Sequence, residues 1–124
     1  MNCNIALSLI VLRCQDIMAT RHFYESLGLL FQQEQHGNGP THYSSVLEGG
    51  LVLELYPATD GVSDNTRLGL FVPALDDAIS RIRQRGITVG NRQSFGDHVF
   101  VVAQDPDGRK VEIVQQPGQM QLAA

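Results

Sequence analysis

The chain has 124 residues, 43% of them hydrophobic, and a formal charge of −4 at pH 7 with a pI near 5.4. This acidic balance argues against nucleic acid or an anionic membrane as a partner, because both attract basic surfaces. No apolar stretch is long enough to span a bilayer, and no signal-like segment begins the chain. We therefore expect a cytoplasmic protein in which Cys3 and Cys14 are free thiols.

The first half of the chain predicts a strand, a helix and three further strands. Leu, Ile and Val fill residues 5–12, and Asp16 can cap a helix that ends at Gly28. The strand-like runs that follow are separated by a loop rich in Gly and Pro and by a Gly-Gly turn. We expect strands at 5–12, 29–33, 42–47 and 51–56, and a helix at 17–27.

The second half predicts the same order of elements after a polar linker at residues 57–66. An apolar run ends at Pro73, and the next apolar residues recur at helical spacing before Gly86. Asp76 and Asp77 open this helix and arginines close it, as the helix dipole favours. We expect strands at 68–72, 87–89, 98–103 and 110–115, a helix from about 75 to 85, and a loop at 90–97.

Matching residues stand at equal separations in the two halves: Gly28 and Gly86, Gly50 and Gly108, Glu54 and Glu112. A fixed period indicates one supersecondary unit used twice. We expect an α+β protein of two βαβββ repeats, whose mixed sheets form a cup-shaped cavity. The predicted single domain, 1–124, has a first unit at about 5–56, a linker at 57–66, a second unit at 67–116 and a frayed tail at 117–124.

The alternation of side chains along the strands predicts which residues face this cavity. If Leu53 and Leu55 pack on a helix, Glu54 points the other way. The same rule turns Arg67 and Phe71 inward in the second half. The expected ligand-binding residues are Leu9, Val11, Val52, Glu54, Tyr56, Arg67, His98, Phe100, Glu112 and Val114.

Two stretches, Phe23-Tyr24-Glu25-Ser26-Leu27-Gly28 and Asp105-Pro106-Asp107-Gly108-Arg109-Lys110-Val111-Glu112, resemble motifs of the vicinal oxygen chelate superfamily. This superfamily includes glyoxalase I, the fosfomycin resistance proteins, the extradiol dioxygenases and the bleomycin resistance proteins. In its metal-dependent members, the resemblance implies, four inward strand positions bind a divalent ion. Carried over to this sequence, those positions are Leu9, Glu54, Arg67 and Glu112.

Two of these four residues depart from the metal-binding pattern. Leu9 has no lone pair to donate, and the guanidinium of Arg67 is a cation that pairs with carboxylates instead. We therefore predict no bound metal and no cofactor, with Arg67 paired to one or both of Glu54 and Glu112. If a metal does bind, we expect Ni, Mn, Fe or Zn on the two glutamates, with a displaced histidine, His42 or His98, restoring the site.

Two functions follow from the resemblance. The first is a metal-independent small-molecule-binding protein, like the bleomycin resistance proteins, that holds a polar or cationic aromatic ligand in an acidic cup. The alternative is a glyoxalase- or dioxygenase-like lyase, isomerase or oxygenase, with a noncanonical metal or with Glu54 or Glu112 as general base. A buried ion cluster in a retired active site is the third possibility. The resemblance also implies a homodimer, with the cup formed within one chain or between halves of two chains.

Overall fold

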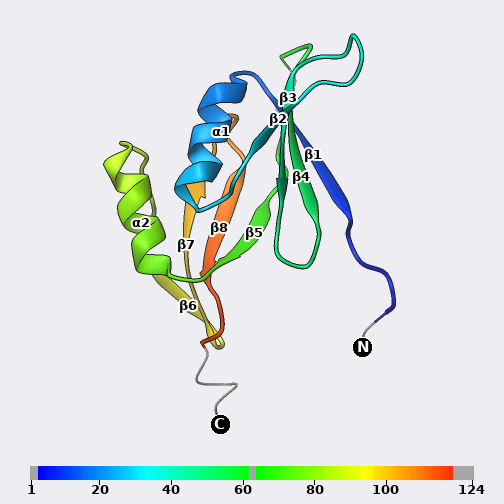
Figure 1. The fold of residues 1–124 in the computed structure, drawn as a ribbon. Helices are drawn as coiled ribbons and strands as arrows, with labels where there is room; N and C mark the ends of the chain where they lie inside the picture. Colours follow the sequence, from blue (N-terminus) through cyan, green and yellow to red (C-terminus); the bar gives the residue numbers. More distant parts are fainter. Residues whose placement is uncertain (1–2, 62–63, 119–124) are drawn as a thin grey trace.

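The computed structural model describes residues 3–61 and 64–118 (Figure 1). It contains two helices and eight strands in the order that a duplicated βαβββ unit requires. In chain order the elements are β1 (Leu9–Cys14), α1 (Ile17–Ser26), β2 (Gln32–Glu34), β3 (His42–Val46), β4 (Val52–Pro57), β5 (Leu68–Val72), α2 (Leu75–Gln84), β6 (Gln93–Phe95), β7 (His98–Gln104) and β8 (Lys110–Gln115).

The strands form two mixed sheets of four, one from each half of the chain. The first sheet has the order β1-β4-β3-β2 and the second has the equivalent order β5-β8-β7-β6. The pairs β1–β4 and β5–β8 are parallel, and the remaining pairs are antiparallel. The predicted α+β class and the two βαβββ units are confirmed.

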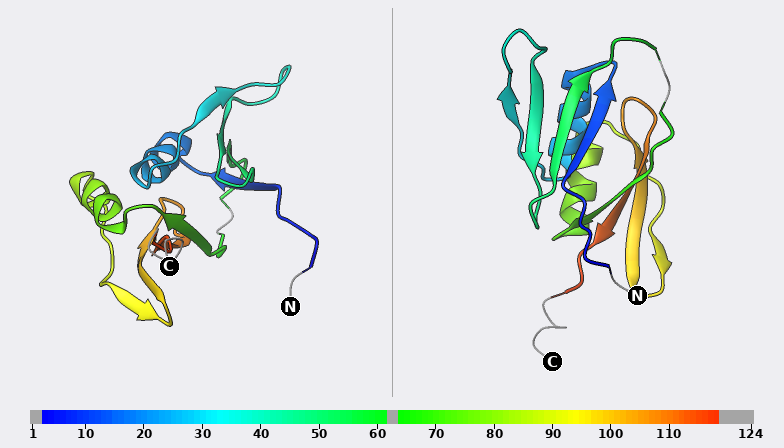
Figure 2. Two further views of the ribbon diagram at one scale, coloured as in Figure 1. Left: turned by 60° about the horizontal axis from the view of Figure 1, so that its bottom comes forward. Right: turned by 90° about the vertical axis from the view of Figure 1, so that its right-hand side faces the viewer.

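The two helices lie side by side (Figures 1 and 2). Two arginines of the second half tie them together: Arg81 Nε donates to the Ser26 carbonyl at 2.8 Å, and the Arg85 guanidinium donates to the His22 carbonyl at 2.7 Å. Each helix packs its apolar side on its own sheet, and the core lies between them. Among the described residues, neither helix is long and apolar enough to cross a membrane.

The residues that predicted where the helices begin and end have the expected conformations and contacts. The Asp16 carboxylate accepts a hydrogen bond from the Ala19 N–H at 3.1 Å, which satisfies an otherwise unpaired donor of the first turn. Gly28 and Gly86 follow the helices with φ of 108° and 76°, a conformation that side chains with a Cβ rarely adopt. Both helices therefore end where the glycines predict.

Several predicted strand positions were wrong. The first strand begins at Leu9 and not at residue 5, and β2 lies at Gln32–Glu34 because Leu29 and Phe31 pack on the core instead of pairing. In the second half, residues 87–89 contribute only an isolated bridge from Val89 to Ala103, and β6 occupies the predicted loop. The predicted tail at 117–124 lies mostly outside the described residues, which end at 118.

The predicted alternation of faces is confirmed by burial. Leu53 and Leu55, which face the helix, are 2% and 0% exposed. In the second sheet, the equivalent residues Val111 and Ile113 are both 0% exposed. Side chains of the opposite faces remain open to solvent in a single chain: Leu9, Val11 and Phe71 are 49%, 38% and 57% exposed. We call these the first-sheet face (Leu9, Val11, His42, Val52, Glu54 and Tyr56) and the second-sheet face (Arg67, Phe71, His98, Phe100, Glu112 and Val114).

Candidate functional site

The residues predicted to contact a ligand fall into two groups, one on each helix-free face. Glu54 is opposite Val11 in the β1–β4 register and opposite Ser44 in the β3–β4 register. Glu112 is opposite Gly69 and Val102 in the second sheet. Among the described residues, no hydrogen bond or ion pair joins Glu54 to the second-sheet face. Each glutamate therefore has its own neighbours within one chain.

Arg67 is the partner of Glu112. Its Nε donates to Glu112 Oε2 at 2.7 Å, and the two side chains are 49% and 33% exposed. Arg67 was expected to pair with one or both glutamates, and within the described part of the single chain it pairs with Glu112 alone. The alternative of a buried cluster that includes Glu54 is not seen among these residues, because the pair is solvated and Glu54 is outside it. An ion pair this exposed adds little to stability.

Glu54 lies beside His42, which is 1% exposed. His42 Nε2 is 3.7 Å from Glu54 Oε2 and 3.3 Å from Glu34 Oε1. The Tyr56 ring stacks on the imidazole with 4.2 Å between centroids and 10° between planes. This stacking explains why a residue at the start of β3 is buried.

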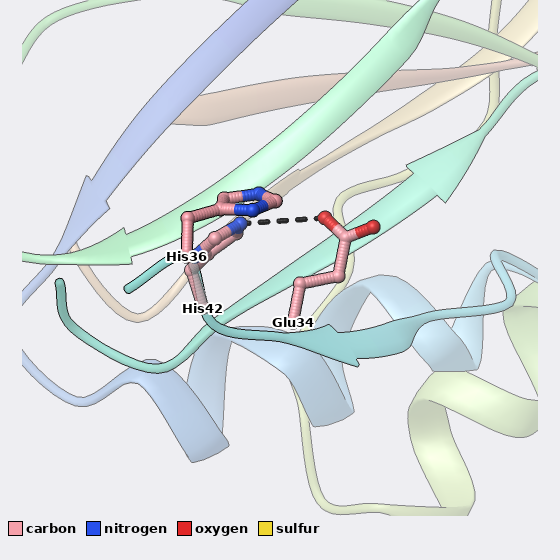
Figure 3. A group of neighbouring side chains, drawn as sticks. All are labelled: Glu34, His36 and His42. Carbon is pink, nitrogen blue, oxygen red and sulfur yellow. Dashed lines mark ion pairs between the residues drawn. The ribbon is translucent and has the colours of Figure 1, made fainter. Parts of the chain in front are cut away.

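A second histidine, His36, completes the group on this face. Figure 3 shows Glu34, His36 and His42 directed toward one another, and their ligand atoms all lie within 4.8 Å of one another. Glu34 and His42 are directly opposite in the β2–β3 register, so the sheet itself sets their contact. The sequence prediction included His42 as an alternative ligand but did not include Glu34 or His36.

The second-sheet face carries aromatic side chains next to Glu112. The rings of Phe71 and His98 meet edge to face with 5.8 Å between centroids, and Phe100 is opposite Val114 in the β7–β8 register. Val114 is 7% exposed, so it forms the floor of this aromatic group and not its rim. His98 is exposed and has no part in the histidine group of the first sheet.

Two cavities are lined mainly by residues outside these faces. One, of about 740 Å³, is lined by residues of α1 and by Arg85, Ile87, Gln104 and Pro106. The other, of about 680 Å³, lies among the residues that follow α1, the end of β3 and the strand β5, and its lining includes Phe71 of the second-sheet face. Neither is lined by Glu54 or Glu112, so neither is the cup that the repeat predicts.

The sequence profile of the Glyoxalase/Bleomycin resistance protein/Dioxygenase superfamily matches residues 6–113. The chain belongs to this family. A comparison with curated protein sequences gave no match.

Several solved structures share the fold. Oxidase ChaP-H2 superposes with a TM-score of 0.74 at 20% identity over 93% of this chain and 96% of that one. TnmS3, an antibiotic binding protein from Streptomyces sp. CB03234, gives 0.73 at 21% identity over 94% and 100%. A glyoxalase/dioxygenase from Nostoc punctiforme gives 0.71 at 24% identity over 95% and 99%.

The residues at the four strand positions of the superfamily's metal site do not fit a metal in this chain. Leu9 offers no donor atom, and Arg67 already occupies Glu112 Oε2. A divalent ion beside the guanidinium would meet a like charge at the carboxylate it needs.

The Asp105-Pro106-Asp107-Gly108 turn, part of the stretch that resembles a family motif, has a structural task. Arg109 is 1% exposed, and its guanidinium pairs with Asp105 at 3.0 Å and with Asp64 at 2.7 Å, and donates to the Arg13 carbonyl. The Tyr24 hydroxyl of α1 donates to Asp105 at 2.8 Å. The turn of the second half is therefore bound to the first half by buried charge, a role that sequence reasoning missed.

Cys14 belongs to the packing and not to the chemistry. Burial raises the pKa of its thiol to about 11, so the thiolate that a nucleophile needs is scarce at neutral pH. Cys3 and Cys14 are both free, as predicted.

Proposed function

We propose that this protein binds a small organic molecule with a polar or cationic aromatic group between its helix-free sheet faces, without a metal at the superfamily's four strand positions. The observation that carries the proposal is the exposure of Leu9, Val11 and Phe71 on the same sheet faces that hold Glu54 and Glu112. Exposed apolar surface next to carboxylates fits a ligand with a ring and a positive charge. The likeness in fold to an antibiotic binding protein supports this reading.

We propose further that a second copy of the chain closes the site. In the single chain Glu54 pairs with His42 while Glu112 pairs with Arg67, and the apolar residues around them are solvent-exposed. If the first-sheet face of one chain met the second-sheet face of a partner, these residues would line one shared cup. A twofold arrangement would give two such cups per dimer.

The proposed organisation is one domain of two units, at about 5–56 and 67–116, in a reducing compartment. Buried charge at Arg109 joins the two halves, which supports a single folding unit. Two free thiols, one of them exposed, fit the cytoplasm.

Thermal denaturation of the chelator-treated protein with a panel of cationic aromatic amines tests the proposal. A ligand that binds only the folded state raises the apparent stability, so at least one compound is expected to raise the Tm. Glu54→Gln and Glu112→Gln are expected to reduce that rise, whereas Glu48→Gln, an exposed glutamate of the β3–β4 turn, keeps it. The proposal fails if no compound raises the Tm, or if Glu48→Gln weakens binding as much as the other two substitutions.

An enzyme is the second candidate, and the closeness of His42 to Glu54 favours it. A carboxylate beside an imidazole can pass a proton to or from a bound substrate, with Glu54 as the general base. Each compound that stabilises the protein should then be recovered after long incubation and analysed by mass spectrometry. Conversion that Glu54→Gln abolishes and Glu48→Gln retains would establish the enzyme, whereas unchanged compound supports the binding protein.

A further inference from the structure

We propose that Glu34, His36 and His42 bind a divalent transition-metal ion such as Zn²⁺, at a site separate from the four strand positions of the superfamily. The three residues come from the end of β2, the β2–β3 loop and the first position of β3 (Figure 3). This site rests on the contacts of its own three residues, one of which, His42, also belongs to the first-sheet face.

The orientation of His42 is the first argument. Its Nδ1 lies 3.3 Å from the Pro40 carbonyl oxygen, which only accepts hydrogen bonds, so Nδ1–H donates and Nε2 is left for another partner. Metal-binding histidines have this arrangement, in which a backbone carbonyl fixes the tautomer and directs the other nitrogen at the ion. The stacked ring of Tyr56 holds the imidazole plane.

The surroundings of Nε2 are the second argument. Its lone pair faces Glu34 Oε1 at 3.3 Å and Glu54 Oε2 at 3.7 Å, a collection of electron-rich atoms. The Tyr56 hydroxyl, 3.3 Å from Nε2, can donate one hydrogen bond but leaves both negative charges uncompensated. Among the described residues, His42 is the only ion-pair partner of either carboxylate. A cation between these atoms compensates the two negative charges that face the lone pair of Nε2. That cation is either a metal ion or a proton on Nε2.

The distances favour a metal ion. Two ligand atoms bound about 2.0 Å from a tetrahedral ion lie about 3.3 Å apart, which matches the separation of His42 Nε2 and Glu34 Oε1. The His36 ring lies with its centroid 5.0 Å from that of His42 and at 39° to it, and one of its ring nitrogens lies within 4.8 Å of the ligand atoms of Glu34 and His42. Glu54 is the nearest additional carboxylate.

The loop that carries His36 has a defined shape that can present the ring. Gly39 N–H donates to the His36 carbonyl at 2.9 Å, and the Gln35 side chain donates to the Gly39 carbonyl at 3.0 Å. Gly37 takes a φ of 57°, which lets the chain turn tightly between the two histidines. His36 is exposed, so metal can reach the site from solvent.

The ligand set defines the class of metal. Two imidazoles and one carboxylate suit Zn²⁺, Ni²⁺, Co²⁺ or Fe²⁺, whereas Mg²⁺ and Ca²⁺ prefer oxygen ligands alone. Three protein ligands also leave a coordination position open, as in catalytic and not structural zinc sites.

Titration of the tag-free, chelator-treated protein with Co²⁺ and Zn²⁺, in the absence of any organic ligand, tests the site. Calorimetry should give one ion per chain, and the visible absorption of Co²⁺ should report nitrogen and oxygen ligands in a tetrahedral or five-coordinate site. His36→Ala and Glu34→Gln, both outside the buried core, should weaken binding by at least about tenfold. His22→Ala and Glu48→Gln, at exposed residues outside both sheet faces, are matched controls that should leave the affinity unchanged. Absence of binding, or binding that His36→Ala and Glu34→Gln do not weaken, overturns the proposal.

Because His42 is buried, a substitution there would change the packing as well as the metal binding. Its role is therefore measured in the unsubstituted protein. In long-range ¹H–¹⁵N spectra of the histidine rings, Zn²⁺ should shift the Nε2 resonance of His42 and the resonances of His36, and leave His22 and His98 in place. If Nε2 of His42 keeps its proton in the presence of excess Zn²⁺, the cation in this group is the proton and the metal site is refuted. The ligand-binding experiment on chelator-treated protein is decided separately from either result.

Discussion

Arg109 shows how much of this fold depends on single charged residues. Its guanidinium is fully buried, yet every contact that the structure gives it is to an oxygen: carboxylates of Asp64, Asp105 and Asp107 and the carbonyl of Arg13. A buried cation is stable only when such partners replace the lost water. The partners come from the turn, from the segment between the halves and from β1, so one side chain links three parts of the chain.

Arg109→Met is expected to lower the free energy of unfolding by about 3–5 kcal/mol, because it leaves the buried Asp105 without its cation. Arg109→Lys should recover only part of the loss, since an ammonium cannot reproduce the planar set of donors. Urea unfolding measures both. The control is Arg83→Met on the exposed side of α2, expected to change stability by less than about 0.5 kcal/mol. Equal effects at both positions would contradict the role given to Arg109.

Asp64 gives this network a pH dependence. Hydrogen bonds from Thr66 and Arg109 lower the pKa of Asp64 to about 2, below the value of about 3.9 expected in an unfolded chain. The stabilisation is therefore fully present above about pH 4 and is lost as the pH falls toward 2. Asp64→Asn should cost roughly 1 kcal/mol at pH 7, a small value because the carboxylate is 34% exposed. Urea unfolding at pH 7, 4 and 2.5 should show that cost shrinking, and a constant cost would refute the account.

The two helices are equivalent in the repeat but differ in how they begin. Asp16 caps α1 through its side chain, whereas Ala74 at the start of α2 offers no cap. The side chain of Gln115 in β8 compensates in part, because its Oε1 accepts from the Leu75 N–H at 2.9 Å. A strand of the same unit thus supplies what the local sequence lacks.

Ala74→Ser should stabilise the protein by roughly 0.5–1 kcal/mol, because the residue already has the extended backbone of an N-cap and the serine hydroxyl can accept from an unpaired N–H of the first turn. Asp16→Ala should have the opposite effect and a similar size. Thermal unfolding of the two variants compares them directly. An unchanged Tm in Ala74→Ser would contradict this prediction, and would mean that the hydrogen bond from the Leu75 N–H to Gln115 already makes a serine cap unnecessary.

The sequence was informative where the signal is local or periodic. Helix ends at Gly28 and Gly86 follow from backbone conformation, and the direction of Glu54 and Glu112 away from the helices follows from strand alternation. The edge strands β2 and β6 could not be placed this way, because their pairing partner and not their apolar content fixes them.

The histidine group was equally hidden from the sequence. His42 is buried because Tyr56, from another strand, stacks on it, and it meets Glu34 only through the β2–β3 register. The sequence predicted that β2 ends one residue before Glu34, so this cross-strand pair could not be read. The sequence did contain one indication of this group, because two histidines, His36 and His42, flank a Gly-rich segment.

For the whole molecule, the exposed apolar residues of the two sheet faces bear on assembly. If a second copy covers them, light scattering after size exclusion should give the mass of a dimer. Leu9→Asp and Phe71→Asp should shift the protein to monomer, because each places a charge in the proposed contact. Leu30→Asp, at a residue that is 85% exposed and outside both faces, should remain dimeric. A monomeric wild type at high concentration would rule out the shared cup.

The most direct measurement of the central claim is the methyl ¹H–¹³C spectrum of the protein with and without a compound that raises its Tm. If the ligand binds between the helix-free faces, the methyl groups of Leu9, Val11, Val52 and Val114 shift. Those of Leu27, Leu29 and Leu47, which line or adjoin the cavity between the halves, stay in place. Shifts confined to the second set would place the ligand in that cavity and contradict the account.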